Sequence, residues 1–152
     1  LTTAYAVTRA VLPQMIERRW GRIVMVSSVT GPVVAYPGDV AYAAAKAGMT
    51  GLMRGLAVEV AVHGITVNAI APAAVDTAML HNEAMYKLFC PDMDAPTRED
   101  VAPRYQAMNR LGVAWMAPEE VSRSVLFVAA DAASSMTGQV IEVSLGSSAG
   151  TH

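Results

Sequence analysis

The sequence predicts an α/β fold built on a parallel sheet, and three observations support this prediction. Three short aliphatic and β-branched runs, 22–27, 65–70 and 139–143, are bounded by turn signals, as buried strands are. Helical stretches at 41–62 and 118–132 separate these runs, which is the pattern of right-handed strand–helix–strand crossovers. The chain of 152 residues is 53% hydrophobic and 16% charged, enough apolar content for one folded core and too much for disorder.

Residues 2–19 are predicted to form an amphipathic helix that Pro13 interrupts. Arg18 and Arg19 favour a helix end by their charge, and Gly21 suits the capping position after it. The run 22–27 follows at once. Because it is rich in β-branched residues and is bounded by turn signals, it is expected to be a strand buried on both faces.

The second helix carries the first chemically suggestive pair. Residues 29–40 hold two glycines and two prolines, which indicates an irregular loop, and the helix 41–62 begins after it. Tyr42 and Lys46 are four residues apart, so both side chains lie on one face of this helix. The helix is apolar on most sides, which favours packing against both the sheet and a partner subunit.

The second strand leads to a loop, 73–77, which parallel topology places at the same sheet edge as Ser28. The next segment, residues 78–117, is the least regular part of the chain and is called the excursion below. Short helical patches at 81–89 and 98–109 are expected within it. A long methionine- and aromatic-bearing segment beside the carboxyl edge of a sheet is typical of a substrate lid.

The last elements follow a clear start signal. Pro118, Glu119 and Glu120 place a proline and two acids in the first turn of the helix 118–132. Thr137-Gly138 is predicted to turn the chain into the last strand, 139–143.

The bulk composition excludes several classes of function. A net charge of −2, with acids and bases interspersed, gives no basic surface for nucleic acid or for a membrane. No apolar run approaches the roughly 18 residues of a spanning helix. The single cysteine, Cys90, cannot form an internal disulfide and is expected to be a packing residue in a reducing compartment, the cytoplasm. The three histidines, His63, His81 and His152, show no metal-ligand spacing, so no metal site is predicted.

Ser28, Tyr42 and Lys46 are the candidate catalytic residues. A tyrosine and a lysine four apart are by themselves more often a half-exposed phenol and a solvated cation. Here Ser27-Ser28 closes a predicted strand shortly before the pair, small residues surround it, and Asn68-Ala-Ile-Ala-Pro72 follows the second strand. A hydroxyl, a phenol and an ammonium at one sheet edge suit proton transfer to or from an alcohol or a carbonyl. No Gly-x-Ser-x-Gly surrounds either serine, so a hydrolase lacks its nucleophile elbow.

The sequence resembles the short-chain dehydrogenase/reductase family. The resemblance is carried by four segments: Gly21-Arg-Ile-Val-Met-Val-Ser-Ser28, Tyr42-Ala-Ala-Ala-Lys46, Asn68-Ala-Ile-Ala-Pro72 with Val75-Asp76-Thr77, and Thr137-Gly138. It implies the C-terminal part of a doubly wound, Rossmann-like parallel sheet, with three strands and flanking helices, as one partial domain over residues 1–152. It also implies hydride transfer between a nicotinamide cofactor and a secondary alcohol or ketone.

The resemblance implies a role for each candidate residue. Tyr42 is the acid/base, and a phenol, whose pKa is about 10 in water, needs a nearby positive charge to work at neutral pH. Lys46 supplies that charge and holds the cofactor ribose, and Ser28 hydrogen-bonds the reacting oxygen. Ser27 is the second choice for that role. Pro72, Val75 and Thr77 fix the nicotinamide, so Tyr42, Lys46 and these three residues form the implied cofactor site, for NAD with NADP as the open alternative.

The sequence also departs from the family pattern. The family's Gly-rich phosphate loop and the residue that selects NAD or NADP are absent. The family's catalytic asparagine would stand immediately before Leu1, and Ala73 stands where a glycine is common. Because the chain begins at Leu1 and not at a methionine, a missing upstream part is expected.

A finer resemblance lies in the excursion. Thr77-Ala-Met79, His81-Asn-Glu83, Met85-Tyr-Lys-Leu-Phe89 and Trp115 before Pro118 look like the mycofactocin-associated branch, which includes carveol dehydrogenases. This branch acts on secondary alcohols and holds NAD tightly. Apolar residues of the excursion suit a hydrophobic substrate, although each one singly could equally cap the core.

Two readings of function therefore stand. The first is an oxidoreductase that uses NAD and a small, apolar alcohol or ketone. The second is a catalytically incomplete fragment of such an enzyme, acting only as a structural or dimerisation module. In this family the helices that match 2–19 and 41–62 pair across a two-fold axis, so a homodimer or homotetramer is expected in either case.

Overall fold

Three parallel strands form the sheet of the computed structural model, which describes residues 1–149. The last three residues of the predicted domain, His152 among them, lie outside the described part. The elements, in chain order, are α1 (Thr2–Glu17), β1 (Gly21–Val26), α2 (Val40–Val60), β2 (Ile65–Pro72), α3 (Glu83–Phe89), α4 (Arg98–Ala107), α5 (Pro118–Ala129) and β3 (Val140–Val143). Single 3₁₀ turns follow α2 and α5, at Ala61–His63 and Asp131–Ala133.

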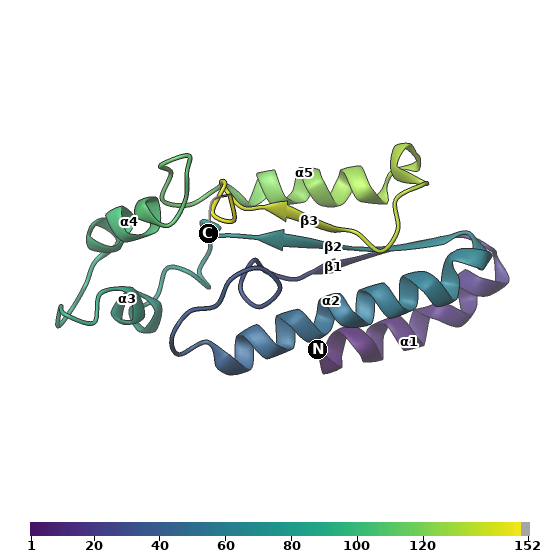
Figure 1. Ribbon diagram of the computed structural model, residues 1–152, viewed down its shortest axis with the longest axis horizontal. Helices are drawn as coiled ribbons and strands as arrows, with labels where there is room; N and C mark the ends of the chain where they lie inside the picture. Colours follow the sequence, from purple (N-terminus) through teal and green to yellow (C-terminus); the bar gives the residue numbers. More distant parts are fainter. Residues whose placement is uncertain (150–152) are drawn as a thin grey trace.

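The sheet has the order β1-β2-β3, with both pairings parallel. Helices α1 and α2 cover one face and α5 covers the other, while α3 and α4 lie beyond the carboxyl ends of the strands (Figure 1). This arrangement confirms the predicted α/β class and the three parallel strands with flanking helices.

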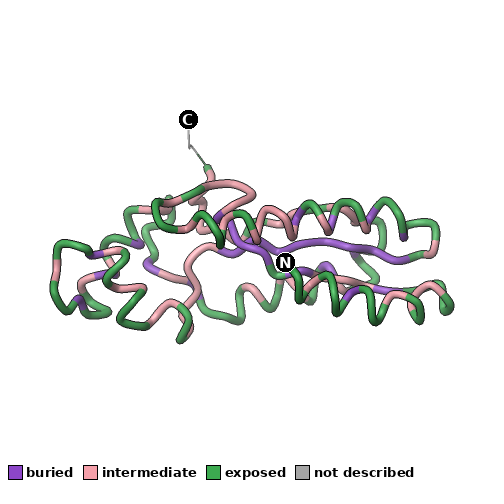
Figure 2. The backbone as a smooth tube through the Cα atoms, turned by 90° about the horizontal axis from the view of Figure 1, so that it is seen from below, coloured by how far each residue is buried: buried purple, intermediate pink, exposed green. Residues whose placement is uncertain are grey.

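The core is centred on β2. All eight residues of β2 are buried (Figure 2), because the strand has a neighbour on each side and helices on both faces. On the side of α1 and α2, the main hydrophobic cluster joins the sheet to α2, and its buried members are Met25, Met53, Ala57, Val60, Ile65, Val67 and Ala69.

The first strand departs from its prediction. It was expected to be buried on both faces, but only Gly21 and Met25 are buried, and Val26 is 49% exposed. Within the described residues β1 pairs with β2 alone, so it is an edge strand and its outer side has no cover.

The end of the first helix also differs from its prediction. Helix α1 ends at Glu17, and the left-handed residue after it is Arg19, with φ of 53°, and not Gly21. Gly21 is the first residue of β1. A Cβ atom there would lie 2.7 Å from Sδ of Met15, so the glycine is needed for close packing of helix on strand and not for capping.

Asn68 ties β2 to the segment that leads into β3. Its side chain is fully buried, its Nδ2 donates to the carbonyl of Met136 at 2.8 Å, and its Oδ1 accepts from the amide of Gln139 at 3.0 Å. The amide of the neighbouring Val67 donates to Oγ1 of Thr137 at 3.0 Å. The Asn68 and Thr137 side chains thus replace ladder bonds where β3 has not yet begun.

This network predicts a stability loss for Asn68→Ala. The substitution empties a fully buried position and leaves the part-buried carbonyl of Met136 and amide of Gln139 without these partners, so the free energy of unfolding should fall by about 2–4 kcal/mol. Urea denaturation followed by circular dichroism measures the change. Gln14→Ala, which removes an exposed amide from α1, is the control and should change stability by less than about 0.5 kcal/mol. Equal midpoints for the two variants would contradict the assignment.

Candidate active site

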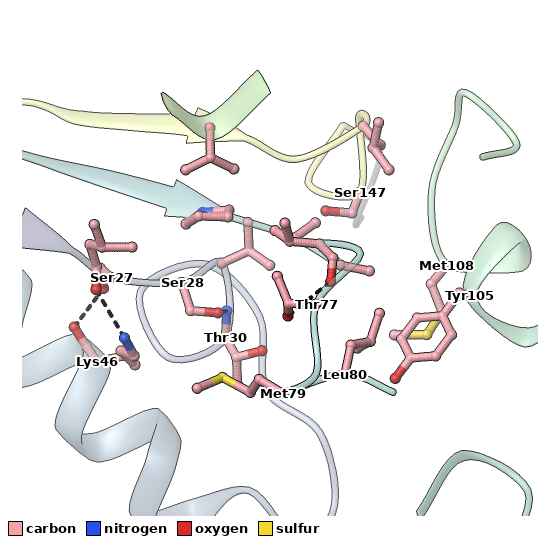
Figure 3. A pocket seen from close by; sticks show the side chains of 18 of the residues that line it. Ser27, Ser28, Thr30, Lys46, Thr77, Met79, Leu80, Tyr105, Met108 and Ser147 are labelled. Carbon is pink, nitrogen blue, oxygen red and sulfur yellow. Dashed lines mark hydrogen bonds between the residues drawn. The ribbon is translucent and has the colours of Figure 1, made fainter. Parts of the chain in front are cut away.

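A pocket of about 1120 Å³ opens at the carboxyl edge of the sheet. All six residues that the sequence singled out line it: Ser28, Tyr42, Lys46, Pro72, Val75 and Thr77. In Figure 3, Ser28 and Lys46 lie on one side of the pocket, and Tyr105 and Met108 of the excursion lie on the other. The parallel sheet therefore brings together residues that three separate stretches of chain supply.

The two serines after β1 have different hydrogen bonds. Oγ of Ser27 donates to the carbonyl of Lys46 at 3.0 Å and so ties the end of β1 to α2. Oγ of Ser28 accepts from the amide of Thr30 at 3.1 Å, which leaves its own hydroxyl proton available to another oxygen. Both side chains are buried, but only Ser28 has a free donor facing the pocket.

Lys46 is held beside Tyr42. Its Nζ donates to the carbonyl of Val26 at 2.9 Å and lies 5.5 Å from the centre of the Tyr42 ring. Burial lowers the pKa of Lys46, because removing the ammonium from water disfavours its charged form. Tyr42 is 42% exposed, so its ring is open to a ligand in the pocket.

The loop before α2 is shaped by a close backbone contact. Gly31 has φ of 106°, and a Cβ atom on it would lie 2.3 Å from the carbonyl oxygen of Ala43. Only glycine allows the loop to approach the helix that closely. This contact holds the loop against the first turn of α2, where Tyr42 is located.

The loop after β2 presents a mixed set of hydrogen-bonding groups. Oγ1 of Thr77 donates weakly to the carbonyl of Val75 at 3.3 Å, and among residues 1–149 the amide of Val75 has no hydrogen-bond partner. Its neighbours are occupied: the amide of Asp76 donates to the carbonyl of Met116, and the amide of Met116 donates to the carbonyl of Ala74. A planar amide, with one donor and one acceptor edge, fits this free amide, carbonyl and hydroxyl.

The excursion has its own small core. Cys90, Val101, Tyr105 and Ala114 are buried there, with apolar residues such as Phe89 and Trp115 around them. Cys90 is fully buried, as expected of a packing residue. The helices inside it are shorter than predicted, at Glu83–Phe89 and Arg98–Ala107: α3 begins two residues later because Asn82 caps its first turn, and α4 begins as predicted after its cap Thr97 but ends two residues earlier.

One cluster of charged residues at the base of the excursion was not foreseen. Oδ1 of Asp76 lies 2.7 Å from Nε2 of His81, and Oδ2 of Asp76 accepts from Nη2 of Arg98 at 2.9 Å. Nδ1 of His81 lies 2.9 Å from the hydroxyl of Tyr86, and the Arg98 guanidinium stacks over Trp115 at 4.6 Å. Asp76 therefore joins the loop after β2 to α4 and to the segment before α3.

Arg98 and His81 stabilise the charged form of Asp76. Desolvation raises the pKa of Asp76, but the hydrogen bonds and positive charges of Arg98 and His81 outweigh it, and the pKa lies below its ordinary value. Asp76 therefore stays ionised and paired at neutral pH. Nothing in the sequence spacing indicated these partners, which come from different turns of the excursion.

Within residues 1–149, no three histidine, cysteine, aspartate or glutamate side chains converge in a way that could hold a metal ion. In the same described part, no helix is both long and apolar enough to span a bilayer.

Comparison with known proteins identifies a family to which this chain is similar. The family model of short chain dehydrogenases matches residues 1–87. The chain is 37% identical to (-)-trans-carveol dehydrogenase of Rhodococcus erythropolis over 147 residues, which is 96% of this chain and 53% of the relative. It is 38% identical to the 3-oxoacyl-[acyl-carrier-protein] reductase FabG of Aquifex aeolicus over 146 residues, which is 96% of this chain and 52% of the relative.

A solved structure is similar over the same extent. The carveol dehydrogenase of Mycobacterium avium, in complex with NAD, superposes with a TM-score of 0.92 at 41% identity, covering 97% of this chain and 53% of that one. The chain thus spans about half the length of the relatives it matches. The predicted resemblance to this family and to carveol dehydrogenases is confirmed.

The cluster at the base of the excursion predicts a local effect of Arg98→Ala. Without the guanidinium, the loop 74–77 loses its tie to α4, so the amides of Asp76, Leu80 and His81 should exchange with solvent roughly fivefold faster. Hydrogen exchange read by mass spectrometry measures this.

Arg104→Ala is the matched control. Arg104 also lies on α4 and also pairs with an aspartate, Asp92, but that pair lies wholly within the excursion. The Arg104→Ala substitution should leave amide exchange in 74–81 unchanged. If both variants accelerate amide exchange in 74–81 equally, the ion pair of Arg98 with Asp76 does not hold this loop.

Proposed function

The chain belongs to the short chain dehydrogenase family, and from this we propose that it takes part in hydride transfer between NAD and a secondary alcohol or ketone of apolar character. The observation that carries the proposal is that Ser28, Tyr42, Lys46 and the loop 72–77 line one pocket. Because the chain spans about half of its relatives, the activity is proposed for the protein in which this half functions.

The residues present fit the nicotinamide end of NAD. The free amide of Val75, its carbonyl and the Thr77 hydroxyl match the donor and acceptor groups of a carboxamide. Pro72 and Ala73 add small side chains to the pocket wall, where a flat ring can lie. When bound, NAD accepts or returns the hydride. NAD is chosen over NADP because the similar carveol dehydrogenase structure holds NAD.

Side chains of this chain transfer the proton and position the reacting oxygen. In alcohol oxidation the Tyr42 oxygen takes the hydroxyl proton of the substrate, and in ketone reduction it returns a proton to the carbonyl oxygen. The Lys46 ammonium, held 5.5 Å from the ring centre, stabilises negative charge on that oxygen. The free hydroxyl proton of Ser28 donates to the reacting oxygen and fixes its position.

The excursion is proposed to be the substrate lid. Its side chains make one wall of the pocket and are almost all apolar, namely Met79, Leu80, Met85, Phe89, Tyr105 and Met108. Such a wall favours a hydrophobic substrate and excludes water from the reacting atoms. A cytoplasmic location is proposed because the single thiol suits a reducing compartment.

Tyr42→Phe is the first test. The substitution keeps the ring but removes the group that exchanges the proton, so kcat should fall about 10²–10⁴-fold with little change in KM. NADH absorbance during oxidation of a cyclic terpenoid alcohol measures the rate. Trp20→Phe, at an exposed aromatic residue outside both the pocket and the groove of α1 and α2, serves as the control and should retain full activity. A retained rate in Tyr42→Phe would remove Tyr42 from the proton-transfer step.

A second candidate function is assembly, and a groove between the first two helices favours it. The groove has a volume of about 310 Å³ and is lined by residues of α1 and α2 that include Tyr5, Leu12, Ile16 and Leu56. Tyr5 in the groove and Val7 near it on α1 are more than half exposed, so they add apolar surface that a second copy could cover. We propose that two copies of the chain pair through α1 and α2.

The assembly proposal predicts a change of mass for Tyr5→Glu. A charge placed in the groove should shift the sedimentation coefficient from that of a dimer to that of a monomer, because an unpaired charge resists burial. Leu111→Glu, which places the same charge on an exposed site of the excursion, should leave the dimer intact. A monomeric parent protein rules out pairing through these helices.

A further inference from the structure

The pocket contains very little charge. Of the described residues that line it, only Asp39 and Lys46 carry a full charge. Lys46 is already engaged, since its ammonium donates to the carbonyl of Val26 and lies beside Tyr42. An anionic group on a substrate would therefore meet no unengaged cation among the described residues that line the pocket.

Asp39 has no partner for its carboxylate. It is the residue before α2, but its side chain does not cap the helix, and within residues 1–149 its carboxylate makes no hydrogen bond or ion pair. The side chain is half-buried, lines the pocket and precedes Tyr42 by one helical turn. Its negative charge therefore borders the pocket without an ionic partner among the described residues.

The negative charge of Asp39 affects tyrosines on both sides of the pocket. Burial raises the pKa of Tyr36, and the nearby charge of Asp39 raises it further. On the opposite wall, the pKa of Tyr105 is raised by burial first, then by Tyr86 and Cys90, with Asp39 contributing as well. Both tyrosines line the pocket, so a ligand between them lies in the same negative potential.

We infer that Asp39 is a specificity-determining residue that restricts the pocket to neutral alcohols and ketones and excludes substrates with a carboxylate or phosphate near the reacting carbon. The inference rests on the proposed function and narrows it. Beside apolar walls, two like charges repel more strongly than in bulk water, and an anion that enters the pocket also loses part of its hydration. A substrate hydroxyl can instead donate to the unpaired carboxylate.

Two ketones of the same shape provide the test, 4-oxocyclohexanecarboxamide and 4-oxocyclohexanecarboxylate. Their binding to the protein is measured by calorimetry near neutral pH and low ionic strength, so the result does not depend on turnover. The carboxamide should bind about tenfold more tightly than the carboxylate. Asp39→Asn, which keeps the shape and removes the charge, should reduce this ratio to about twofold by improving carboxylate binding.

Asp94→Asn is the matched control. Asp94 is an exposed aspartate in the excursion that does not line the pocket, so its substitution should leave the ratio unchanged. Added salt should lower the ratio in the parent protein, because ions screen a half-buried charge.

Several outcomes would overturn the inference: equal binding of the two ketones to the parent protein, the same ratio in Asp39→Asn, or no binding of the carboxamide. Reduction of the bound carboxamide by NADH is followed separately. Selective binding without reduction would contradict the proposed hydride transfer and leave the role of Asp39 intact, so the two failures are distinguishable.

Discussion

The parallel pairing of β1 with β2 is the interaction on which the site depends. Its register sets Val26 opposite Ile70, and two further bonds continue it past the end of β1, from the amide of Ser27 to Ile70 and from the amide of Val29 to Pro72. Since both strands run in the same direction, their following loops emerge at one edge. A shift of the pairing by one residue would turn Ser28 away from the pocket and Ser27 toward it.

The helix α2 is attached to that edge by side chains that also take part in the proposed chemistry. Ser27 donates to the carbonyl of Lys46, and the ammonium of Lys46 donates to the carbonyl of Val26, so strand and helix are linked in both directions (Figure 3). The links keep the ammonium in place although burial lowers its pKa. A charged group that is both fixed and partly desolvated acts more strongly on its neighbours than a mobile one in water.

The excursion is anchored separately from the sheet core. Its buried cluster around Tyr105 is distinct from the main cluster around Met53. It joins the rest through the paired segments at Val75 and Met116, through Asp76, and through the amides of Arg110 and Leu111, which donate to the carbonyl of Leu145 after β3. A unit with its own core and ties mainly at its ends can change position without disturbing the sheet. The same base carries Val75 and Thr77, so any movement of the excursion is coupled to the groups proposed to hold the nicotinamide.

The sequence by itself determined the element order, the parallel sheet and the edge at which Ser28, Tyr42, Lys46 and Thr77 meet. These follow from local rules, namely hydrophobic periodicity, breakers and the helical spacing of Tyr42 and Lys46, which hold whatever the rest of the chain does. The exposure of β1, the free hydroxyl proton of Ser28 and the unpaired state of Asp39 were decided only by the tertiary structure. The ion-pair partners of Asp76 were also decided only by the tertiary structure. Ion pairs between distant segments depend on how the excursion folds back on the loop, and no spacing in the sequence encodes this arrangement.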